Sequence, residues 1–170
     1  KTKVSKIDTK LYKSILSEKD LDKLIDILNT KPFISIDTET SSLNPLEAKL
    51  IGISFSYAPN EAYYIPLEHK NIKSLNKESV LKKIKPLLED PSIKKVGQNI
   101  KYDFIILRNN GIDIDPVEDT MLLSYVLDAG NNRHNMDTLS ELHLGHKTIS
   151  YKDVVGTGKK QLNFSDINLE

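Results

Sequence analysis

The sequence predicts an α/β fold with a mixed β-sheet, and three observations lead to that prediction. Over its 170 residues, strand-like apolar segments are combined with segments whose apolar residues recur at helical spacing. The turn APNE, residues 58–61, separates two strand-like segments and indicates an antiparallel hairpin. The elements after this hairpin follow the order helix, strand and helices, which is typical of helices layered on a sheet. Residues 1–170 fit a single domain, which buries about two-thirds of its unfolded surface and so can form a hydrophobic core.

Local signals place the expected elements in order. The first helix is expected at residues 17–29, because Ser17 can cap it, Asp20 completes a start that resembles a capping box, and apolar residues recur at helical spacing. The expected strands are FISID (33–37), LIGISFSY (50–57), AYYIPL (62–67) and KKVG (94–97). Further helices are expected at about residues 78–89, 99–111, 120–127 and 138–143. Residues 1–16 are interpreted as a lead-in segment, and the chain from Lys147 onwards as loop with a weak helix or turn.

The composition excludes several classes of function. The 24 basic and 24 acidic residues give zero formal charge, which argues against a module that holds nucleic acid by bulk charge alone. An enzyme whose bound metal ions supply local positive charge stays compatible with this balance. The sequence has no cysteine, so a disulfide framework, a thiolate metal site and a cysteine nucleophile are excluded. Its apolar runs are too short to cross a bilayer and no signal peptide is recognised, so no membrane association is expected.

The first chemical signal is the segment FISIDTETSSL, residues 33–43, which starts as a hydrophobic strand and then presents Asp37 and Glu39. Side chains two residues apart share one face of a strand, so these carboxylates converge. Close anions repel each other unless a cation lies between them. Two interpretations follow from these residues alone: Asp37 opens a turn, or the pair binds a cation.

The second signal is Asp103, which lies four residues after Asn99 and is expected on the same face of a helix. The apolar residues Ile100, Phe104 and Leu107 are expected to pack on a neighbouring face. An aspartate among apolar helix residues is unfavourable unless it faces solvent or a cation. Asp103 is therefore interpreted either as a surface acid or as a further cation ligand.

Other polar signals have structural interpretations. Asp119 and Asp137 each precede a predicted helix and are expected to be N-caps. The segment GTGKK, residues 156–160, lacks the first glycine and the final Ser or Thr of a phosphate-binding loop, and we expect a basic loop near nucleic acid instead. His143 and His146 have no third ligand nearby, so a zinc site is not expected there.

Several segments together resemble one family. DTETSSL (37–43) is similar to the first motif, and VGQNIKYDF (96–104) to the second motif, of the proofreading 3′–5′ exonuclease domain of bacterial DNA polymerase I. The likeness continues in the same order through DTMLLSYVLDAGNNRHNMDTLSE, HKTISY and GTGKKQLNF, and it covers the chain from about residue 10 onwards. This family belongs to the DEDD exonucleases, so the resemblance implies a ribonuclease H-like three-layer fold with a central mixed sheet flanked by helices.

The resemblance also implies a metal centre with two divalent ions, Mg²⁺ or Mn²⁺. It implies that Asp37 ligates both ions, that Glu39 holds the first ion and helps to orient the attacking water, and that Asp103 holds the second ion partly through water. Cations between Asp37 and Glu39 would remove the repulsion that their spacing creates.

The resemblance further implies contacts with a DNA strand. Thr40 and Leu43 match positions that contact the terminal nucleotide, with Leu43 as a wedge against its base. Tyr151 matches a position that places a ring against an unstacked base, which suits single-strand binding because every base offers a face for stacking. Leu43 as a core residue and Tyr151 as a half-buried aromatic are the alternatives. The remaining matches are Gln98, Asn99 and Tyr102, which would line the strand, and Arg133, which would approach a backbone phosphate.

The sequence departs from the family at one point, since it contains no third motif of the form Tyr-x-x-x-Asp. Asp166 and Glu170 are in the wrong register to replace it. We therefore expect a fragment of a longer DNA polymerase I that shows weak or no activity by itself.

The implied function is hydrolysis at the 3′ end of single-stranded or frayed DNA, by a cytoplasmic monomer whose partner is the polymerase domain of the same full-length chain. Two alternatives remain open: a catalytically silent platform for a polymerase domain, and an exoribonuclease of the same superfamily.

Overall fold

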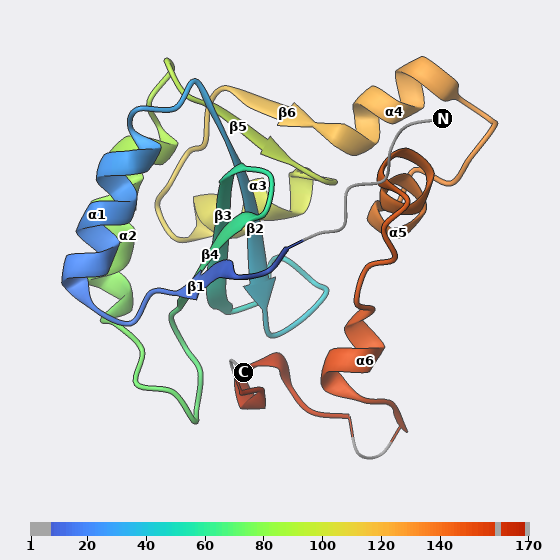
Figure 1. The fold of residues 1–170 in the computed structure, drawn as a ribbon. Helices are drawn as coiled ribbons and strands as arrows, with labels where there is room; N and C mark the ends of the chain where they lie inside the picture. Colours follow the sequence, from blue (N-terminus) through green and yellow to red (C-terminus); the bar gives the residue numbers. More distant parts are fainter. Residues whose placement is uncertain (1–7, 159–160, 169–170) are drawn as a thin grey trace.

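The computed structural model describes residues 8–158 and 161–168, which form a six-stranded sheet with helices packed against it (Figure 1). The spatial order of the strands is β1-β4-β3-β2-β5-β6. β3 runs antiparallel to β2 and β4, whereas the pairs β1–β4, β2–β5 and β5–β6 are parallel. The predicted α/β class, the mixed sheet and the hairpin are therefore confirmed. The strands are β1 (Leu11–Ser14), β2 (Phe33–Thr40), β3 (Leu50–Ala58), β4 (Glu61–Pro66), β5 (Lys94–Gly97) and β6 (Val117–Asp119).

The two outer strands were not predicted. β1 lies within the segment interpreted as a lead-in, and all four of its residues are exposed, so it lacks the alternation that marks a half-buried strand. β6 has only three residues and directly precedes a helix. Both strands form by pairing in parallel with a neighbour that is distant in sequence, and local patterns do not show such pairing.

The helices follow the predicted positions closely. In α1, Ser17 Oγ accepts a hydrogen bond of 3.2 Å from the backbone N–H of Asp20, as the capping signal predicted. The helices and helical turns are α1 (Glu18–Leu28), α2 (Lys77–Leu88), α3 (Lys101–Asn109), α4 (Thr120–Asp128), α5 (Met136–Leu139), the π-helical turn η1 (Ser140–Leu144), α6 (Tyr151–Val155) and the 3₁₀ turn η3 (Phe164–Asp166).

Two predicted helix starts are wrong. α3 begins at Lys101, because Asn99 has a left-handed backbone with φ 57° and so precedes the helix. Asn99 and Asp103 therefore do not share a helix face. α5 begins at Met136 with Asn135 as its N-cap, so Asp137 lies in the first turn instead of capping it, and its carboxylate accepts a hydrogen bond from Thr148.

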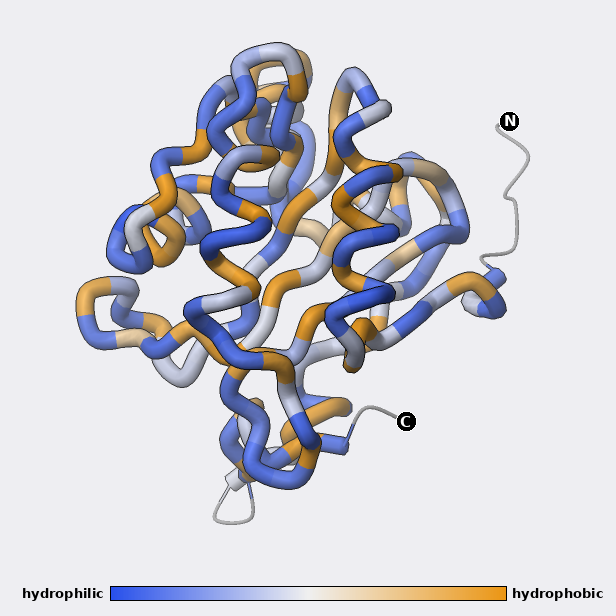
Figure 2. The backbone as a smooth tube through the Cα atoms, turned by 90° about the vertical axis from the view of Figure 1, so that its left-hand side faces the viewer, coloured by the Kyte–Doolittle hydropathy of each residue, from blue (hydrophilic) through white to orange (hydrophobic). Residues whose placement is uncertain are grey.

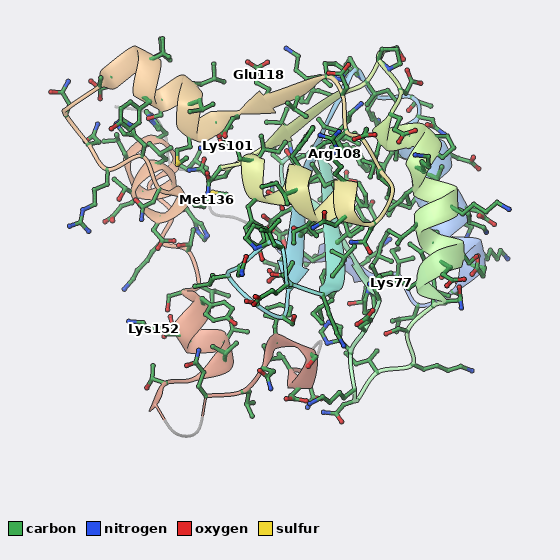
Figure 3. All side chains as sticks on the ribbon, turned by 180° about the vertical axis from the view of Figure 1, so that it is seen from behind. Lys77, Lys101, Arg108, Glu118, Met136 and Lys152 are labelled. Carbon is green, nitrogen blue, oxygen red and sulfur yellow. The ribbon has the colours of Figure 1, made fainter. Side chains whose placement is uncertain are left out.

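One hydrophobic core joins the sheet to α1, α2 and α3, and it contains Leu24, Ile84 and Ile106 from these helices with Ile34, Ile36 and Ile53 from the strands. α1 and α2 lie side by side, and α3 lies across the sheet with Lys101 and Arg108 near its ends (Figures 1 and 3). Hydrophobic and hydrophilic residues alternate along α1 and α2, which face the viewer in Figure 2. None of the helices in the described part of the chain is both long and apolar enough to cross a membrane.

Candidate active site

The site forms where one edge of β2 loses its neighbouring strand. β5 pairs with β2 only from Phe33 to Ser35 and then ends at Gly97, where the chain turns towards α3. On its other edge, β2 stays paired with β3 as far as Thr40. The last residues of β2 are thus fixed on one side and open on the other. This arrangement leaves room for a side chain of α3 to reach the strand.

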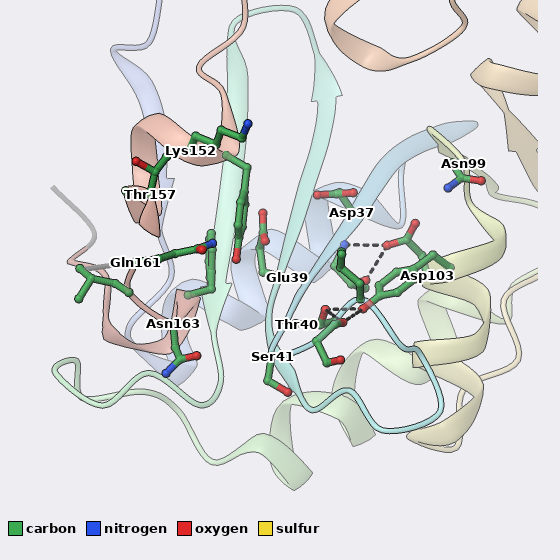
Figure 4. Close-up of a pocket in the computed structure, with 18 of the residues that line it drawn as sticks. Asp37, Glu39, Thr40, Ser41, Asn99, Asp103, Lys152, Thr157, Gln161 and Asn163 are labelled. Atoms are coloured by element: carbon green, nitrogen blue, oxygen red, sulfur yellow. Dashed lines mark hydrogen bonds between the residues drawn. The ribbon is translucent and has the colours of Figure 1, made fainter. Parts of the chain in front are cut away.

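Asp103 of α3 fills this position. Its side chain is 3% exposed, so the interpretation as a surface acid is wrong. Its Oδ1 accepts two hydrogen bonds from Thr38, one from the backbone N–H at 2.9 Å and one from Oγ1 at 2.6 Å (Figure 4). Thr38 lies between Asp37 and Glu39 on β2. The hydrogen bonds therefore join the helix acid to the strand that carries the acid pair.

The three carboxylates interact electrostatically. Asp37 is exposed at the cleft, but the protein around it partly desolvates its carboxyl group, and this desolvation together with the charge of Asp103 raises the pKa of Asp37 to about 6. Desolvation, followed by the charges of Asp37 and Asp103, raises the pKa of Glu39 to about 7. Desolvation also raises the pKa of Asp103, against the lowering effect of the Thr38 hydrogen bonds. In the absence of a cation, each of the three acids thus binds a proton more readily than a free carboxyl group does.

Asp37, Glu39 and Asp103 border one cleft of about 1170 Å³. Its other wall comes from α6 and the chain that follows, including Lys152, Gln161 and Asn163 (Figure 4). The predicted site residues that line the cleft are Asp37, Glu39, Thr40, Leu43, Gln98, Asn99, Tyr102, Asp103 and Tyr151. A cleft of this kind, with convergent acids and perturbed pKa values, indicates an active site.

The comparisons with known proteins identify the family. A family model described as 3′–5′ exonuclease matches residues 12–167. This chain belongs to the 3′–5′ exonuclease family. The chain is 41% identical over 165 residues to DNA polymerase I of Pseudomonas aeruginosa, and 44% identical over 170 residues to DNA polymerase I of Borreliella burgdorferi. These matches cover 94% and 98% of the chain, but the chain spans only 18% of the length of either relative.

Solved structures share the fold of this chain. Escherichia coli RNase D, described as an exoribonuclease involved in structured RNA processing, superimposes with a TM-score of 0.66 at 22% identity, over 86% of this chain and 36% of that one. Brucella melitensis NrnC with bound Mg²⁺ superimposes with a TM-score of 0.61 at 21% identity, over 88% of this chain and 67% of that one. The expected ribonuclease H-like fold is thus confirmed.

In this exonuclease domain, the loop after β2 is fixed by Tyr102 of α3. The Tyr102 hydroxyl donates a hydrogen bond to the carbonyl of Ser42 and bonds to Oγ1 of Thr40. The hydroxyl of Tyr102 thus stabilises the loop after β2 through these two hydrogen bonds. Leu43 projects from the same loop and is 95% exposed, so the alternative that it is a core residue is wrong.

The turn before α3 is fixed by Asp119. Its carboxylate accepts hydrogen bonds from the backbone N–H groups of Asn99 at 2.9 Å and Ile100 at 3.1 Å. The same carboxylate accepts from Met121 N at 2.9 Å, so the predicted N-cap of α4 is confirmed. Gln98 next to this turn donates from Nε2 to the carbonyl of His134 at 2.7 Å.

The wall opposite β2 is held to the rest of the domain by its last described residues. The carboxylate of Asp166 forms an ion pair of 2.7 Å with Nζ of Lys70. The backbone N–H of Lys70 donates a hydrogen bond of 2.9 Å to the carbonyl of Ser165. The carboxylate of Asp166 thus pairs with Lys70. Glu170, the other residue compared with the third motif, lies outside the described residues. Tyr151 is 54% exposed and stacks on Phe164, with ring centroids 6.4 Å apart and an interplanar angle of 12°.

The basic residues considered for nucleic-acid binding differ in their position relative to the cleft. Arg133 is exposed in the loop between α4 and α5, and it is not among the residues that line the cleft. Lys159 and Lys160 of the predicted basic loop lie outside the described residues. Lys152 was missed by sequence reasoning, although its position beside Tyr151 at the start of a short helix was a usable signal.

Proposed function

We propose that this chain removes nucleotides from the 3′ end of single-stranded or frayed DNA by hydrolysing phosphodiester bonds, as the proofreading part of a DNA polymerase I. The supporting observation is that Asp37, Glu39 and Asp103, from a strand and a helix, border one open cleft. Membership of the 3′–5′ exonuclease family supports the reaction, and the identity to two bacterial DNA polymerases I supports the DNA substrate.

The acids suit hard divalent cations, which prefer carboxylate oxygens. Asp37 and Glu39 would hold one Mg²⁺ or Mn²⁺, and Asp37 with Asp103 would hold a second. When bound, such a pair of ions activates water and stabilises the leaving oxygen. No group of three or more Asp, Glu, His or Cys side chains that could hold one ion occurs within residues 8–158 and 161–168. Each proposed ion would take two carboxylates from this chain, and Mg²⁺ usually takes one or two carboxylates and completes its shell with water and substrate phosphate.

The remaining cleft residues would position the strand. Leu43 would wedge against the terminal base, since its side chain is almost fully exposed at the end of a loop fixed by Tyr102. Tyr151 would stack against a base, since its ring is accessible and lies parallel to the ring of Phe164, which also lines the cleft. Selectivity for frayed ends follows because unpairing a nucleotide requires least free energy at a mismatch.

Four further cleft residues would contact the strand, and one residue outside the cleft would approach it. Thr40 would contact the terminal nucleotide. Asn99 would line the path of the strand with its side-chain amide, because its internal hydrogen bond uses the backbone N–H. The polar groups of Gln98 and Tyr102 already form internal hydrogen bonds, so these residues would contribute the second amide hydrogen of Gln98 and the ring face of Tyr102. Arg133 would approach a phosphate of a longer strand, beyond the residues that line the cleft.

We place this activity within a longer protein. The relatives are DNA polymerases I of which the matched region is 18%, so a polymerase domain of the same chain is the proposed partner. A monomer in the cytoplasm suits this role. We propose that a Tyr-x-x-x-Asp motif belongs to the same longer protein.

The test is degradation of 5′-labelled single-stranded DNA in Mg²⁺, with this chain beside one that also carries a third-motif segment. We expect stepwise shortening by the longer chain and weak or no shortening by the shorter one. Asp37→Asn in the longer chain should reduce the rate at least about 100-fold, because metal-assisted stabilisation is worth several kcal/mol. Glu47→Gln, an exposed acid outside the cleft, is the matched control. A longer chain that folds but cleaves nothing would favour the silent platform, and faster cleavage of a matched RNA would favour an exoribonuclease.

A further inference from the structure

Thr38 is the residue that no functional assignment above uses, although it lies at the centre of the site. It is 7% exposed and follows Asp37 directly on β2. Side chains alternate along a strand, so Thr38 shares the face of β2 on which Ile34 and Ile36 are buried, opposite to that of Asp37 and Glu39. Thr38 nevertheless also borders the cleft. Its hydroxyl meets the carboxylate of Asp103.

Both donors of Thr38 converge on the same oxygen of Asp103. The backbone N–H and Oγ1 contact Oδ1 at 2.9 and 2.6 Å, and among the described residues none donates a hydrogen bond to Oδ2. Oδ1 is thus fully engaged within the protein, while Oδ2 stays available on a residue that lines the cleft (Figure 4). The 2.6 Å contact lies within the range of hydrogen bonds to an ionised carboxylate, which is the state of Asp103 that a bound cation would favour.

We propose that Thr38 is a positioning residue, which fixes the Asp103 carboxylate so that Oδ2 faces the same cation site as Asp37. This inference rests on the proposed metal-dependent function. Thr38 then fixes the position of the helix acid Asp103 relative to the strand acids Asp37 and Glu39. Thr38 and Asp103 are 65 residues apart in the sequence. The backbone donor alone would leave the carboxylate free to rotate about that single hydrogen bond, whereas the second donor fixes its orientation. Partners behind a metal ligand act in this way in other metal sites.

The test uses Thr38→Val, which keeps the side-chain shape and the backbone N–H but removes the hydroxyl, and Thr38→Ser, which keeps the hydroxyl. Binding of Mn²⁺ is measured by titration calorimetry on the chain as printed, together with thermal melting in EDTA. Loss of a partner behind a ligand typically weakens metal affinity about 10–100-fold, so we expect Thr38→Val to bind one Mn²⁺ at least about tenfold more weakly. Thr38→Ser should bind within about threefold of the wild type, since the same donor is present.

The control is Thr30→Val, which removes a hydroxyl that donates to the carbonyl of Ile27 far from the cleft and should leave Mn²⁺ affinity unchanged. A Thr38→Val protein that binds Mn²⁺ as tightly as the wild type, or a Thr38→Ser protein that binds as weakly as Thr38→Val, overturns the inference and leaves the exonuclease proposal standing. A wild-type chain that binds no Mn²⁺ overturns the positioning inference, and the cleavage assay on the chain with a third motif then decides the exonuclease proposal. Thr38-dependent Mn²⁺ binding without DNA cleavage by the chain with a third motif would retain the positioning role and remove the nuclease proposal.

Discussion

Glu39→Gln should stabilise the metal-free protein at alkaline pH. The pKa of Glu39 rises from its ordinary value of 4.5 to about 7 in the folded chain, first because of desolvation and then because of the charges of Asp37 and Asp103. A carboxyl whose folded pKa lies above its unfolded pKa binds protons more tightly when folded. The free energy of unfolding therefore falls as pH rises from about 4.5 to about 7, and it stays low above that range.

The magnitude follows from the two pKa values. The difference corresponds to about 3 kcal/mol, at about 1.36 kcal/mol for each pKa unit. Glu39 is partly exposed to the solvent of the cleft, so screening reduces the effect, and we expect about 1–2 kcal/mol. The neutral amide of Gln avoids this penalty. The melting temperature of Glu39→Gln in EDTA at pH 8 should exceed that of the wild type by about 2–8 °C, and the difference should vanish near pH 4.5.

The assay is thermal unfolding in EDTA across pH 4.5–8, repeated with Mg²⁺. Mg²⁺ should raise the melting temperature of the wild type at pH 8 more than that of Glu39→Gln, because only the wild type keeps both acids for the ion. Glu47→Gln should follow the wild-type curve at each pH. If Glu39→Gln melts at or below the wild-type temperature at pH 8 in EDTA, then the three acids do not destabilise one another and the reasoning about the site is wrong.

Two further predictions concern residues around the acids. Gly52→Ala should lower the free energy of unfolding by about 1–3 kcal/mol, since a Cβ there would lie 2.0 Å from the hydroxyl oxygen of Tyr64. Chemical denaturation measures this loss. A Gly52→Ala/Tyr64→Ala double variant should lose less free energy of unfolding than the sum of the two single losses. Leu43→Ala should change stability by less than about 0.5 kcal/mol, because the side chain is 95% exposed, but in the chain with a third motif it should slow digestion of a frayed duplex end about tenfold relative to a single strand. Equal slowing on both substrates would contradict the wedge.

Much of the site could be predicted from local sequence patterns. The period of two in FISIDTET places Asp37 and Glu39 on the same side of β2, and the structure keeps them there. The start of α1 at Ser17 and the cap of α4 at Asp119 were predictable in the same way, because a cap depends on residues within one turn.

The position of Asp103 could not be derived from local patterns. It depends on where β5 stops pairing with β2, and on a contact across 65 residues of chain. The same holds for β1, which forms only because β4 offers it an edge, and for the left-handed turn at Asn99 that moves the start of α3. The spacing of side chains along one element is thus set by backbone geometry and can be read from the sequence. Which elements meet is set by long-range packing and hydrogen bonding, so only the tertiary structure brought Thr38, Asp103 and the wall around Tyr151 to the acid pair.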